Sequence, residues 1–474
     1  MARTVSIDPV TRIEGHAHIT IDLDDHGFVS DARFHVTQLR GFEMFCEGRP
    51  FAEMPSLMAR ICGICPVSHL IASSKACDAL MAVSIPPNGA RLRRIINKAQ
   101  IVQSHALNFF HLSSPDLLLG MDADPAERHM FGVLRQHPEQ MKEGIRLRAF
   151  GQEVIRRLGG KRVHPGWVVP GGVSHPIEEE TRDEILGELS EMLVIVERNL
   201  DWFKGHMEGF QEEIRSFANF PTLFMAMVDE KGHLDFYDGK LRFVNASGHR
   251  VGDDVAVEDY RSVIAERNEP DSYLKSPYYA PMGYPDGIYR VGPLARMNVV
   301  EALGTNMADQ ELAEFRQLSR GAVLSSFHYH YARLIEVLYS LESIKELLEH
   351  PDILDKHVRA HAEPNATEGI GASEAPRGTL FHHYEIDRNG LMKRANLIIA
   401  TGHNNLAMNR GVLQVAKHFI NDGQLTDGAL NRVEAVIRAF DPCLSCSTHA
   451  VGHMPMDVTL RDADGNVVER KVRS

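Results

Sequence analysis

The sequence predicts an α+β protein, mainly α, in which a central bundle of long helices carries small peripheral antiparallel sheets. Long segments show the helical repeat of apolar residues, and shorter ones alternate apolar and polar residues as strands do. Two similar cysteine pairs stand near opposite ends of the 474-residue chain and must meet if they share a site. This length suggests about three domains. The cysteines instead favour one large domain over residues 1–449, followed by an extension over residues 450–474.

Residues 1–37 are predicted to form a β-hairpin or meander. His18–Leu23 alternates apolar and polar residues, Asp24–Gly27 is a turn signal, and Phe28–Val36 alternates again.

Helical patterns begin at Met54 and are broken at Pro66 and at Pro86–Pro87. Long helices that pack side by side favour a bundle. The predicted long helices are Asn88–Leu112, Gln136–Leu158, Ile177–Phe217 and Asp309–Glu349.

Shorter elements are expected in the remaining segments. Residues 222–286 are rich in Gly, Pro and Tyr and predict a small sheet with long loops. Strands are predicted at Thr379–Tyr384 and Met392–Ala400, around the turn Asp387–Gly390. A helix over Leu430–Phe440 must end at Pro442.

Composition excludes several classes of protein. The net charge of −13, without a dense stripe of Lys and Arg, argues against a nucleic-acid partner. A run of apolar residues long enough to span a membrane is absent from the sequence. The N-terminus lacks the apolar core of a secretory signal. Paired thiols favour a reducing compartment, so a cytoplasmic location is expected.

Four of the six cysteines form two Cys-x-x-Cys pairs, Cys62 with Cys65 and Cys443 with Cys446. The two-residue gap lets both sulfurs of a pair face one metal ion. His69 and His449 follow the two pairs. Three interpretations remain open from spacing alone: a catalytic soft metal, a structural zinc, and a redox disulfide within each pair. Structural zinc usually joins knuckles about 15 to 20 residues apart, whereas these pairs stand at opposite ends of the chain.

The segments around both pairs resemble the metal-binding signatures of nickel–iron hydrogenase large subunits. They are Arg60-x-Cys62-Gly63-x-Cys65-x-x-x-His69 and Asp441-Pro442-Cys443-x-x-Cys446-x-x-His449. The start of the chain and the residues within the motifs are most similar to hydrogenases of the soluble, NAD-reducing bidirectional type. Further motifs match in the expected order: Asp8–His16, Arg40–Glu43, His164–Pro165 with Pro170–Gly172, Ala375–Gly378, and Ala400–Asn405.

The resemblance implies reversible heterolytic cleavage of dihydrogen at a nickel–iron centre whose iron carries carbon monoxide and cyanide. By motif position, Cys62 and Cys443 are expected to be terminal nickel ligands, and Cys65 and Cys446 to bridge to the iron. Cys443 is the expected first proton acceptor. Glu14 matches the carboxylate that carries the proton away, although an ion pair with Arg12 is the simpler interpretation of its spacing.

Pro376 and Arg377 are expected to cover the open edge of the metals. The resemblance makes Asp116 and Asp441 the carboxylates that hold Arg377 in place by pairing with it.

Hydrogen bonds to the centre are expected from two further groups. Thr401 offers a hydroxyl to a cyanide, and His69 donates to a cysteine sulfur or an iron ligand. Glu43, His449 and a backbone carbonyl near Leu397 suggest a magnesium site. His328, His330, His382 and His383 are interpreted as core or surface residues.

The remaining cysteines, Cys46 and Cys77, cannot hold an iron–sulfur cluster, which usually takes four thiolates. The expected partners are therefore an iron–sulfur small subunit, together with a flavin-bearing NAD diaphorase pair. Deazaflavin, sulfur or a membrane chain are alternative acceptors, and a zinc-stabilised scaffold is the competing class. The resemblance also implies nickel-insertion factors and a maturation protease that cleaves after His449. The extension contains a predicted hairpin, with its turn at Asp462–Gly465.

Overall fold

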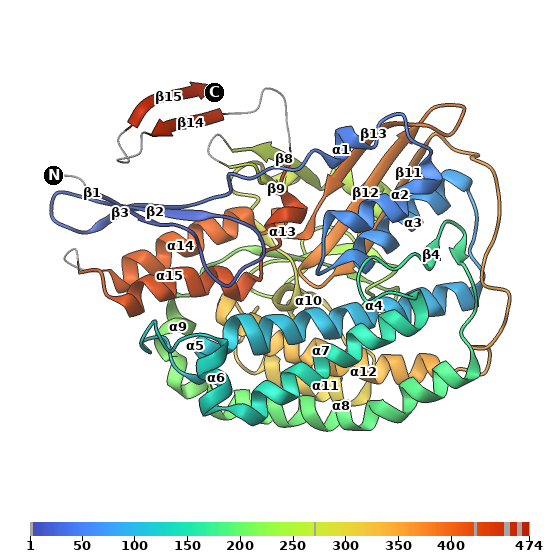
Figure 1. Ribbon diagram of the computed structural model, residues 1–474, viewed down its shortest axis with the longest axis horizontal. Helices are drawn as coiled ribbons and strands as arrows, with labels where there is room; N and C mark the ends of the chain where they lie inside the picture. Colours follow the sequence, from blue (N-terminus) through green and yellow to red (C-terminus); the bar gives the residue numbers. More distant parts are fainter. Residues whose placement is uncertain (1–2, 270–271, 421–423, 450–455, 462–466, 474) are drawn as a thin grey trace.

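The computed structural model describes residues 3–269, 272–420, 424–449, 456–461 and 467–473. Long helices pack side by side across one half of the molecule and form the predicted bundle (Figure 1). Its members are α4 (Pro87–Leu107), α7 (Pro138–Gly159), α8 (Glu179–His206) and α12 (Tyr329–Leu348).

The inner and outer helices of the bundle differ in how much of their surface is buried. On α7, buried side chains recur every three or four residues, as at Leu147, Val154 and Leu158, because only one face meets the core. Most positions of α4 and α12 are buried, including Arg93 and Glu336. The two inner helices therefore bring charged groups into the centre of the fold.

Two predicted helices are broken in the structure. The segment predicted as Asp309–Glu349 forms α11 (Asn306–Arg316) and α12 instead. A connection passes between them at Gly321, where a Cβ atom would lie 2.8 Å from the carbonyl oxygen of Ala246. This close approach favours glycine, because a side chain would have to displace the Ala246 backbone.

The other break follows His206, where α8 ends and a short turn leads to α9 (Gln211–Ser216). The predicted helix Asn88–Leu112 is continuous by contrast: α4 runs to Leu107, and a π-helical turn over Asn108–Ser113 leads directly into α5 (Ser114–Leu118). The remaining helices outside the metal centre are α2 (Met54–Met58), α6 (Met130–Gln136), α10 (Pro293–Val299) and α14 (Asn405–Phe419).

The N-terminal meander is confirmed, with β2 paired to antiparallel strands on both sides. A second antiparallel sheet has the order β11-β12-β13 and includes the two strands predicted near the Asp387–Gly390 turn. The strands are β1 (Arg3–Ile7), β2 (His18–Leu23), β3 (Val29–His35), β11 (Glu368–Ala375), β12 (Gly378–Ile386) and β13 (Met392–Ile398).

Strand β11, which the sequence analysis did not predict, packs closely on helix α3 (Pro66–Met81). A Cβ atom at Gly371 would lie 2.1 Å from the carbonyl oxygen of Ala72. Only glycine allows the strand and the helix to approach this closely. The sheet thereby fixes the helix that begins directly after the first cysteine pair.

The small sheets predicted in residues 222–286 are present, although β10 pairs with β6 in parallel. The predicted C-terminal hairpin is also present, at the edge of the molecule (Figure 1), and its turn lies outside the described residues. A further two-stranded sheet pairs β4 (Val168–Val169) with β5 (Gly172–Val173). The other strands are β6 (Leu223–Val228), β7 (Lys240–Val244), β8 (Ile264–Asn268), β9 (Lys275–Tyr279), β10 (Tyr289–Arg290), β14 (Met456–Arg461) and β15 (Val467–Arg473). Among the described residues, no helix is long and apolar enough to cross a membrane.

Candidate metal centre

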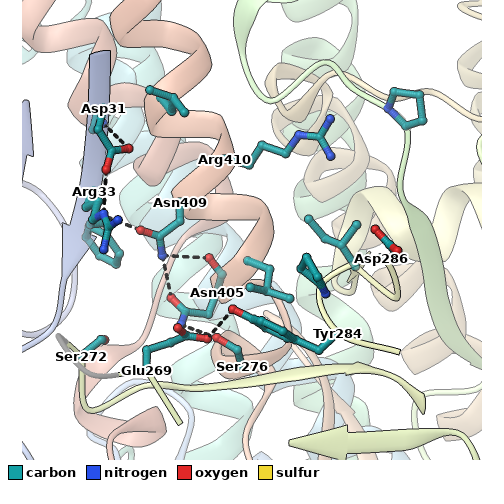
Figure 2. Close-up of a pocket in the computed structure, with 17 residues that line it drawn as sticks. Asp31, Arg33, Glu269, Ser272, Ser276, Tyr284, Asp286, Asn405, Asn409 and Arg410 are labelled. Atoms are coloured by element: carbon teal, nitrogen blue, oxygen red, sulfur yellow. Dashed lines mark hydrogen bonds and ion pairs between the residues drawn. The ribbon is translucent and has the colours of Figure 1, made fainter. Parts of the chain in front are cut away.

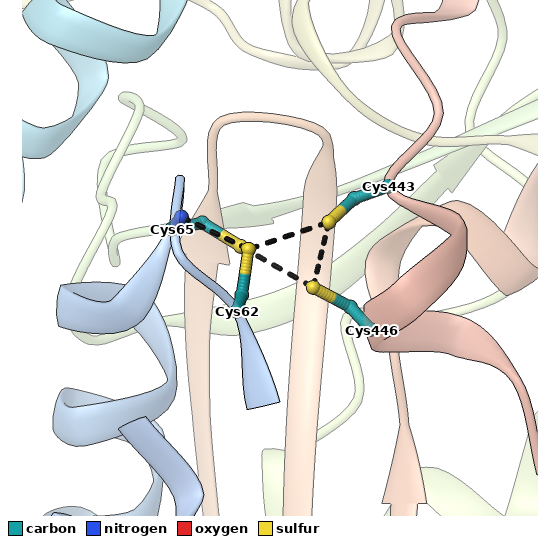
Figure 3. Close-up of side chains that lie close together, drawn as sticks. All are labelled: Cys62, Cys65, Cys443 and Cys446. Atoms are coloured by element: carbon teal, nitrogen blue, oxygen red, sulfur yellow. Dashed lines mark hydrogen bonds between the residues drawn. The ribbon is translucent and has the colours of Figure 1, made fainter. Parts of the chain in front are cut away.

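The four paired cysteines converge on one point, as Figure 3 shows. The Sγ atoms of Cys62 and Cys443 lie 3.4 Å apart, those of Cys65 and Cys446 3.7 Å, and those of Cys443 and Cys446 2.7 Å. All four side chains are buried, with at most 5% of their surface exposed. The first and last parts of the domain therefore meet at a closed cluster of four sulfurs.

The local backbone orients the side chains of the first cysteine pair, Cys62 and Cys65, toward the cluster. Cys62 follows a 3-10 turn over Ala59–Ile61, and Cys65 is the N-cap of α3, whose first residue is Pro66. Proline is favoured at this position because its fixed φ suits a helix start and its missing N–H is not needed there. The Sγ atom of Cys62 accepts hydrogen bonds from the backbone N–H groups of Ile64 and Cys65, both at 3.2 Å. These bonds hold the sulfur against the turn.

The second pair lies between two helices, α15 (Asp427–Phe440) and α16 (Leu444–Ser447). Asp441 ends α15 in a left-handed conformation with φ of 55°, so the chain turns sharply before Pro442. The backbone N–H of Cys443 donates to the Thr401 hydroxyl oxygen at 2.9 Å. Thr401 belongs to α13 (Ala400–His403), so a second element fixes this loop.

The electrostatics of the cluster fit a soft metal. Burial raises the pKa of the Cys443 and Cys446 thiols well above the usual range. Hydrogen bonds from Cys443, Cys446 and Cys62, joined by one from His69, lower the pKa of Cys65 well below that range. Without a cation, repulsion between buried sulfurs this close prevents all four from ionising. A bound soft cation offsets this repulsion, and nickel and iron are soft enough to bind thiolate ligands.

Glu14 lies against the second cysteine loop. Its carbonyl oxygen accepts from the backbone N–H of Leu444 at 3.1 Å, and its carboxylate accepts from the backbone N–H of Ser445 at 3.0 Å and from the Ser445 hydroxyl. Gly15, with φ of +91°, permits this approach, because a Cβ atom there would lie 2.7 Å from the Leu444 Cβ atom. The carboxylate thus sits on the loop between Cys443 and Cys446, and Ser445 is a contact that the sequence analysis missed.

Arg377 is held by Asp441, as predicted. One guanidinium nitrogen lies 3.0 Å from the Asp441 carboxylate, Nε donates to the Asp441 carbonyl, and Nη1 lies 3.5 Å from the Ser104 hydroxyl. Burial alone would lower the pKa of Arg377, but Asp441 and the charges of Cys443 and Cys65 raise it well above its usual value. The guanidinium is therefore a fixed positive charge beside the sulfurs.

A buried ion-pair cluster fixes the loop before Arg377. Arg296 donates to the carbonyl oxygens of Ala375 and Pro376 at 3.0 and 3.2 Å. The same guanidinium pairs with Glu336 and Glu374, and all three side chains are fully buried. Their roles were not predicted, since the spacing of single charges in the sequence does not reveal such a cluster.

The predicted role of Asp116 is wrong. Its carboxylate pairs with Arg12 at 2.6 Å and with Arg438 at 3.0 Å, rather than with Arg377. The π-helical turn before α5 sets the position of Asp116, and two guanidinium groups neutralise it there. Arg12, which the simpler interpretation of spacing gave to Glu14 as an ion-pair partner, pairs with Asp116 instead.

Glu43 and His449, which were predicted to share a magnesium site, are in contact. The His449 Nδ1 atom lies 3.1 Å from the Glu43 carboxylate, which also accepts from the Leu397 backbone N–H at 2.8 Å. Burial alone would raise the pKa of Glu43, but the hydrogen bond and charge of His449 hold it below the usual value. Helix α1 (Phe42–Phe45) carries Glu43.

A void of about 10 Å³ lies beside these groups and is also lined by Cys446. That volume is close to the minimum for one water-sized particle. Leu397 presents an N–H group to Glu43, whereas the prediction required its carbonyl oxygen as a ligand. Glu43 and His449 are thus suitable donors for a small hard cation, and the contribution of Leu397 stays a prediction.

Two other features could attract a ligand. The carboxylates of Glu368 and Glu385 lie near His383, but they face Arg261 and Arg394, which neutralise them. Both ring nitrogens of His383 are also engaged, by the Tyr260 hydroxyl at 2.9 Å and by Glu368 at 2.7 Å. These groups satisfy one another.

The second feature is a surface pocket of about 580 Å³ (Figure 2). None of the described residues that line it is a cysteine. Its polar groups largely pair with each other, as the Tyr284 hydroxyl does with Glu269 at 3.0 Å and Asn405 with Ser276 at 2.9 Å. The pocket is separate from the cluster of sulfurs, so volume alone does not identify the reactive site.

Comparisons with known proteins decide the family. Residues 40–142 and 206–449 match the family described as Nickel-dependent hydrogenase, and residues 4–39 match one described as HoxL-like. The NAD-reducing hydrogenase HoxS subunit beta of Cupriavidus necator is 40% identical over the full length of both chains. The chain belongs to the nickel-dependent hydrogenase family. The prediction from the motifs is confirmed.

Other relatives of this hydrogenase chain match it over most of their length. A chain of the F420-non-reducing hydrogenase vhu of Methanococcus voltae is 41% identical, and the match covers 88% of this chain and 99% of that relative. A crystal structure of an NAD⁺-reducing [NiFe]-hydrogenase in the H2-reduced state is 42% identical and covers 94% of this chain and 99% of its own, with a TM-score of 0.91. The mainly helical fold and the nickel–iron hydrogenase class are thereby confirmed.

Proposed function

We propose that this chain is the catalytic subunit of an NAD-reducing nickel–iron hydrogenase, which splits dihydrogen reversibly into protons and electrons. The observation that supports this most strongly is the convergence of four buried cysteine sulfurs from the two ends of the domain. The contacts of Glu14 and Arg377 with the same loop support it further.

Each cysteine has a proposed place in the centre. Cys62 and Cys443 would hold nickel, and Cys65 and Cys446 would be shared between nickel and an iron that carries carbon monoxide and cyanide. The metals, when bound, polarise dihydrogen so that one hydrogen leaves as a proton and the bonding electron pair stays behind. The close Cys443–Cys446 and Cys62–Cys443 contacts agree with four sulfurs around a shared metal pair.

The proposed proton path runs from Cys443 to Glu14. Ser445 lies between the two cysteines of the second pair and donates to the Glu14 carboxylate through both its N–H and its hydroxyl. A carboxylate can accept a proton, reorient and release it, whereas a backbone amide cannot. Glu14 is therefore the group proposed to carry the proton away from Cys443.

The other side chains orient the centre. Arg377 covers the sulfurs on one side, with Pro376 fixed before it, and its donors fit an anionic cyanide. Asp441 holds Arg377, the Thr401 hydroxyl can serve a second cyanide, and His69 donates to Cys65.

Magnesium is proposed to bind Glu43 and His449, with Leu397 and water completing the site. We further propose that a maturation protease cleaves after His449, once nickel-insertion factors have acted, and removes residues 450–474. The backbone N–H of His449 donates to Tyr273 and Leu274 pairs with Thr448, so the segment before the cleavage position is tied to the domain. Ala450 itself lies outside the described residues.

Electrons are proposed to leave through an iron–sulfur small subunit. Cys46 and Cys77 are buried, with hydrogen bonds from their thiols to backbone carbonyls at 3.0 and 3.3 Å. Burial raises the pKa of Cys46 to about 12, so both behave as small core residues rather than cluster ligands. A flavin-bearing diaphorase pair would then pass the electrons to NAD in the cytoplasm.

The acceptor is tested by purifying the chain with its native partners and measuring hydrogen-dependent reduction. NAD should be reduced at a rate comparable to that of an artificial dye. Reduction of a deazaflavin, with the dye active and NAD inert, would contradict NAD as the acceptor while leaving the hydrogenase assignment in place.

A further inference from the structure

A chain of buried hydrogen bonds leads away from the cysteine cluster through His69. The Nδ1 atom of His69 lies 3.1 Å from Nε2 of His382, and Nδ1 of His382 lies 2.6 Å from the Tyr384 hydroxyl. That hydroxyl lies 2.7 Å from the hydroxyl of Ser73. All four side chains are at most 1% exposed, so water does not compete for these bonds.

Regular secondary structure builds this chain. His69 and Ser73 are four residues apart on α3 and therefore lie on the same face of the helix. His382 and Tyr384 are two residues apart on β12 and point to the same face of the sheet. The sheet packs against the helix, so the two faces meet along matched positions.

One orientation of the hydrogen bonds between His69, His382, Tyr384 and Ser73 satisfies all their donors and acceptors. A neutral imidazole has one donor nitrogen and one acceptor nitrogen. His69 follows Cys65, the N-cap of α3, by four residues and is assigned as a donor to its sulfur, so in this orientation its Nδ1 accepts from Nε2–H of His382. The Nδ1 atom of His382 then accepts from the Tyr384 hydroxyl, which has a single hydrogen. In this orientation the Ser73 hydroxyl turns to donate to the Tyr384 oxygen, 2.7 Å away.

His382 is uncharged in this arrangement. Burial, followed by the nearby His69, lowers the pKa of His382 well below its usual value. Its ring nitrogens face an imidazole and a phenol, which are neutral groups. A hydrogen bond to thiolate sulfur withdraws electron density from it, and such bonds help set the potential of metal–sulfur centres.

We propose that His382, supported by Tyr384 and Ser73, is a positioning residue that fixes the tautomer and orientation in which His69 donates to the Cys65 sulfur. The inference rests on the proposed function, because its effect is felt at the metals that Cys65 binds. It assigns a role to three side chains that the sequence analysis placed in the core or did not consider.

The test uses the purified complex loaded with nickel and iron. His382→Leu removes the donor to His69, His382→Gln retains an amide donor, and Tyr384→Phe removes only the hydroxyl. The controls are His383→Leu and Tyr260→Phe. They delete a similar buried His–Tyr pair, at 2.9 Å, that belongs to the neighbouring position of β12.

Two measurements report on the sulfur independently of turnover: the carbon monoxide stretching band in the infrared, and the midpoint potential of the nickel paramagnetic signal. His382→Leu should shift the band to lower frequency and the potential to more negative values. Activity should fall roughly 10- to 100-fold, as for other groups that orient metal ligands. The loss should lie in kcat rather than in KM for hydrogen. His382→Gln should recover most of each shift, Tyr384→Phe should shift both quantities less, and the controls should shift neither.

A fully loaded His382→Leu complex with the wild-type band and potential would overturn the proposal. So would equal shifts in His382→Leu and His383→Leu. If His382→Leu fails to load metal, Tyr384→Phe decides the matter by the same two measurements. Absence of a carbon monoxide band in the wild type would contradict the proposed iron ligands instead, and the nickel potential would then decide the role of His382.

Discussion

Replacement of Glu14 by Gln tests the proposed proton path most sharply. The side chain keeps its length, but an amide does not release and recover a proton as a carboxyl group does. General acid–base transfer typically contributes about 10²- to 10⁴-fold to a rate. Hydrogen oxidation by Glu14→Gln should therefore fall by about that factor, provided that the metals are present in full.

The structure also sets a cost in stability for the same change. The Glu14 carboxylate accepts from both the N–H and the hydroxyl of Ser445. An amide has one oxygen, so its NH2 group must face one of these donors, and the hydroxyl can turn but the backbone N–H cannot. Loss of a hydrogen bond to a charged group costs about 1.5–3 kcal/mol. A modest decrease in thermal midpoint should accompany the much larger loss of activity.

The assay compares three rates in the purified complex: hydrogen oxidation with a dye, exchange of D2 with water, and conversion of para- to ortho-hydrogen. Conversion needs cleavage within the site but no release of the proton to solvent, so it should persist while the other two rates fall. Glu434→Gln is the matched control, because Glu434 holds the same N-terminal segment by accepting from the Thr11 N–H at 2.6 Å. Wild-type oxidation by a fully metallated Glu14→Gln complex would refute the path.

Three further changes follow from buried contacts. Asp441→Ala leaves the buried Arg377 unpaired and should cost about 3–5 kcal/mol of stability, measured by thermal unfolding; an unchanged midpoint would contradict the pairing. Gly371→Ala forces β11 away from α3 and should cost about 1–3 kcal/mol, with reduced nickel content in the purified protein; full metal content and stability would contradict the tight contact. For Asp116, burial alone would raise the pKa, but Arg438 and Arg12 outweigh it and lower the pKa below 3.8. The contribution of Asp116 to stability is thus present above that pH and lost as the pH falls through the lower, folded-state pKa. The difference in thermal midpoint between wild type and Asp116→Asn should therefore shrink below about pH 3.8. A difference that stays constant with pH would contradict the ion pairs.

The sequence was most informative where chemistry depends on residue type and short spacing. The two Cys-x-x-Cys pairs predicted a shared site, and the structure places their sulfurs together. Proline and glycine located several element ends, such as Pro66 before α3 and Pro442 after α15. The roles of Glu14 and Arg377 came from the resemblance of motifs, and their contacts agree with it.

The sequence was least informative where a role depends on which elements pack together. Asp116 was assigned to Arg377, but the π-helical turn places it between Arg12 and Arg438. His382 was interpreted as a core residue, because a single histidine in a strand does not reveal the helix that it faces. The break at Gly321 was missed since the flanking residues keep a helical pattern.

Metal analysis of the purified complex, combined with replacement of Cys446 by Ser, tests the central claim most directly. The account predicts one nickel per wild-type catalytic chain together with infrared bands of metal-bound carbon monoxide and cyanide, and loss of both the nickel and these bands from the Cys446→Ser complex. Stoichiometric zinc in the wild type, without nickel or iron, would contradict a nickel–iron centre and favour a zinc-stabilised scaffold.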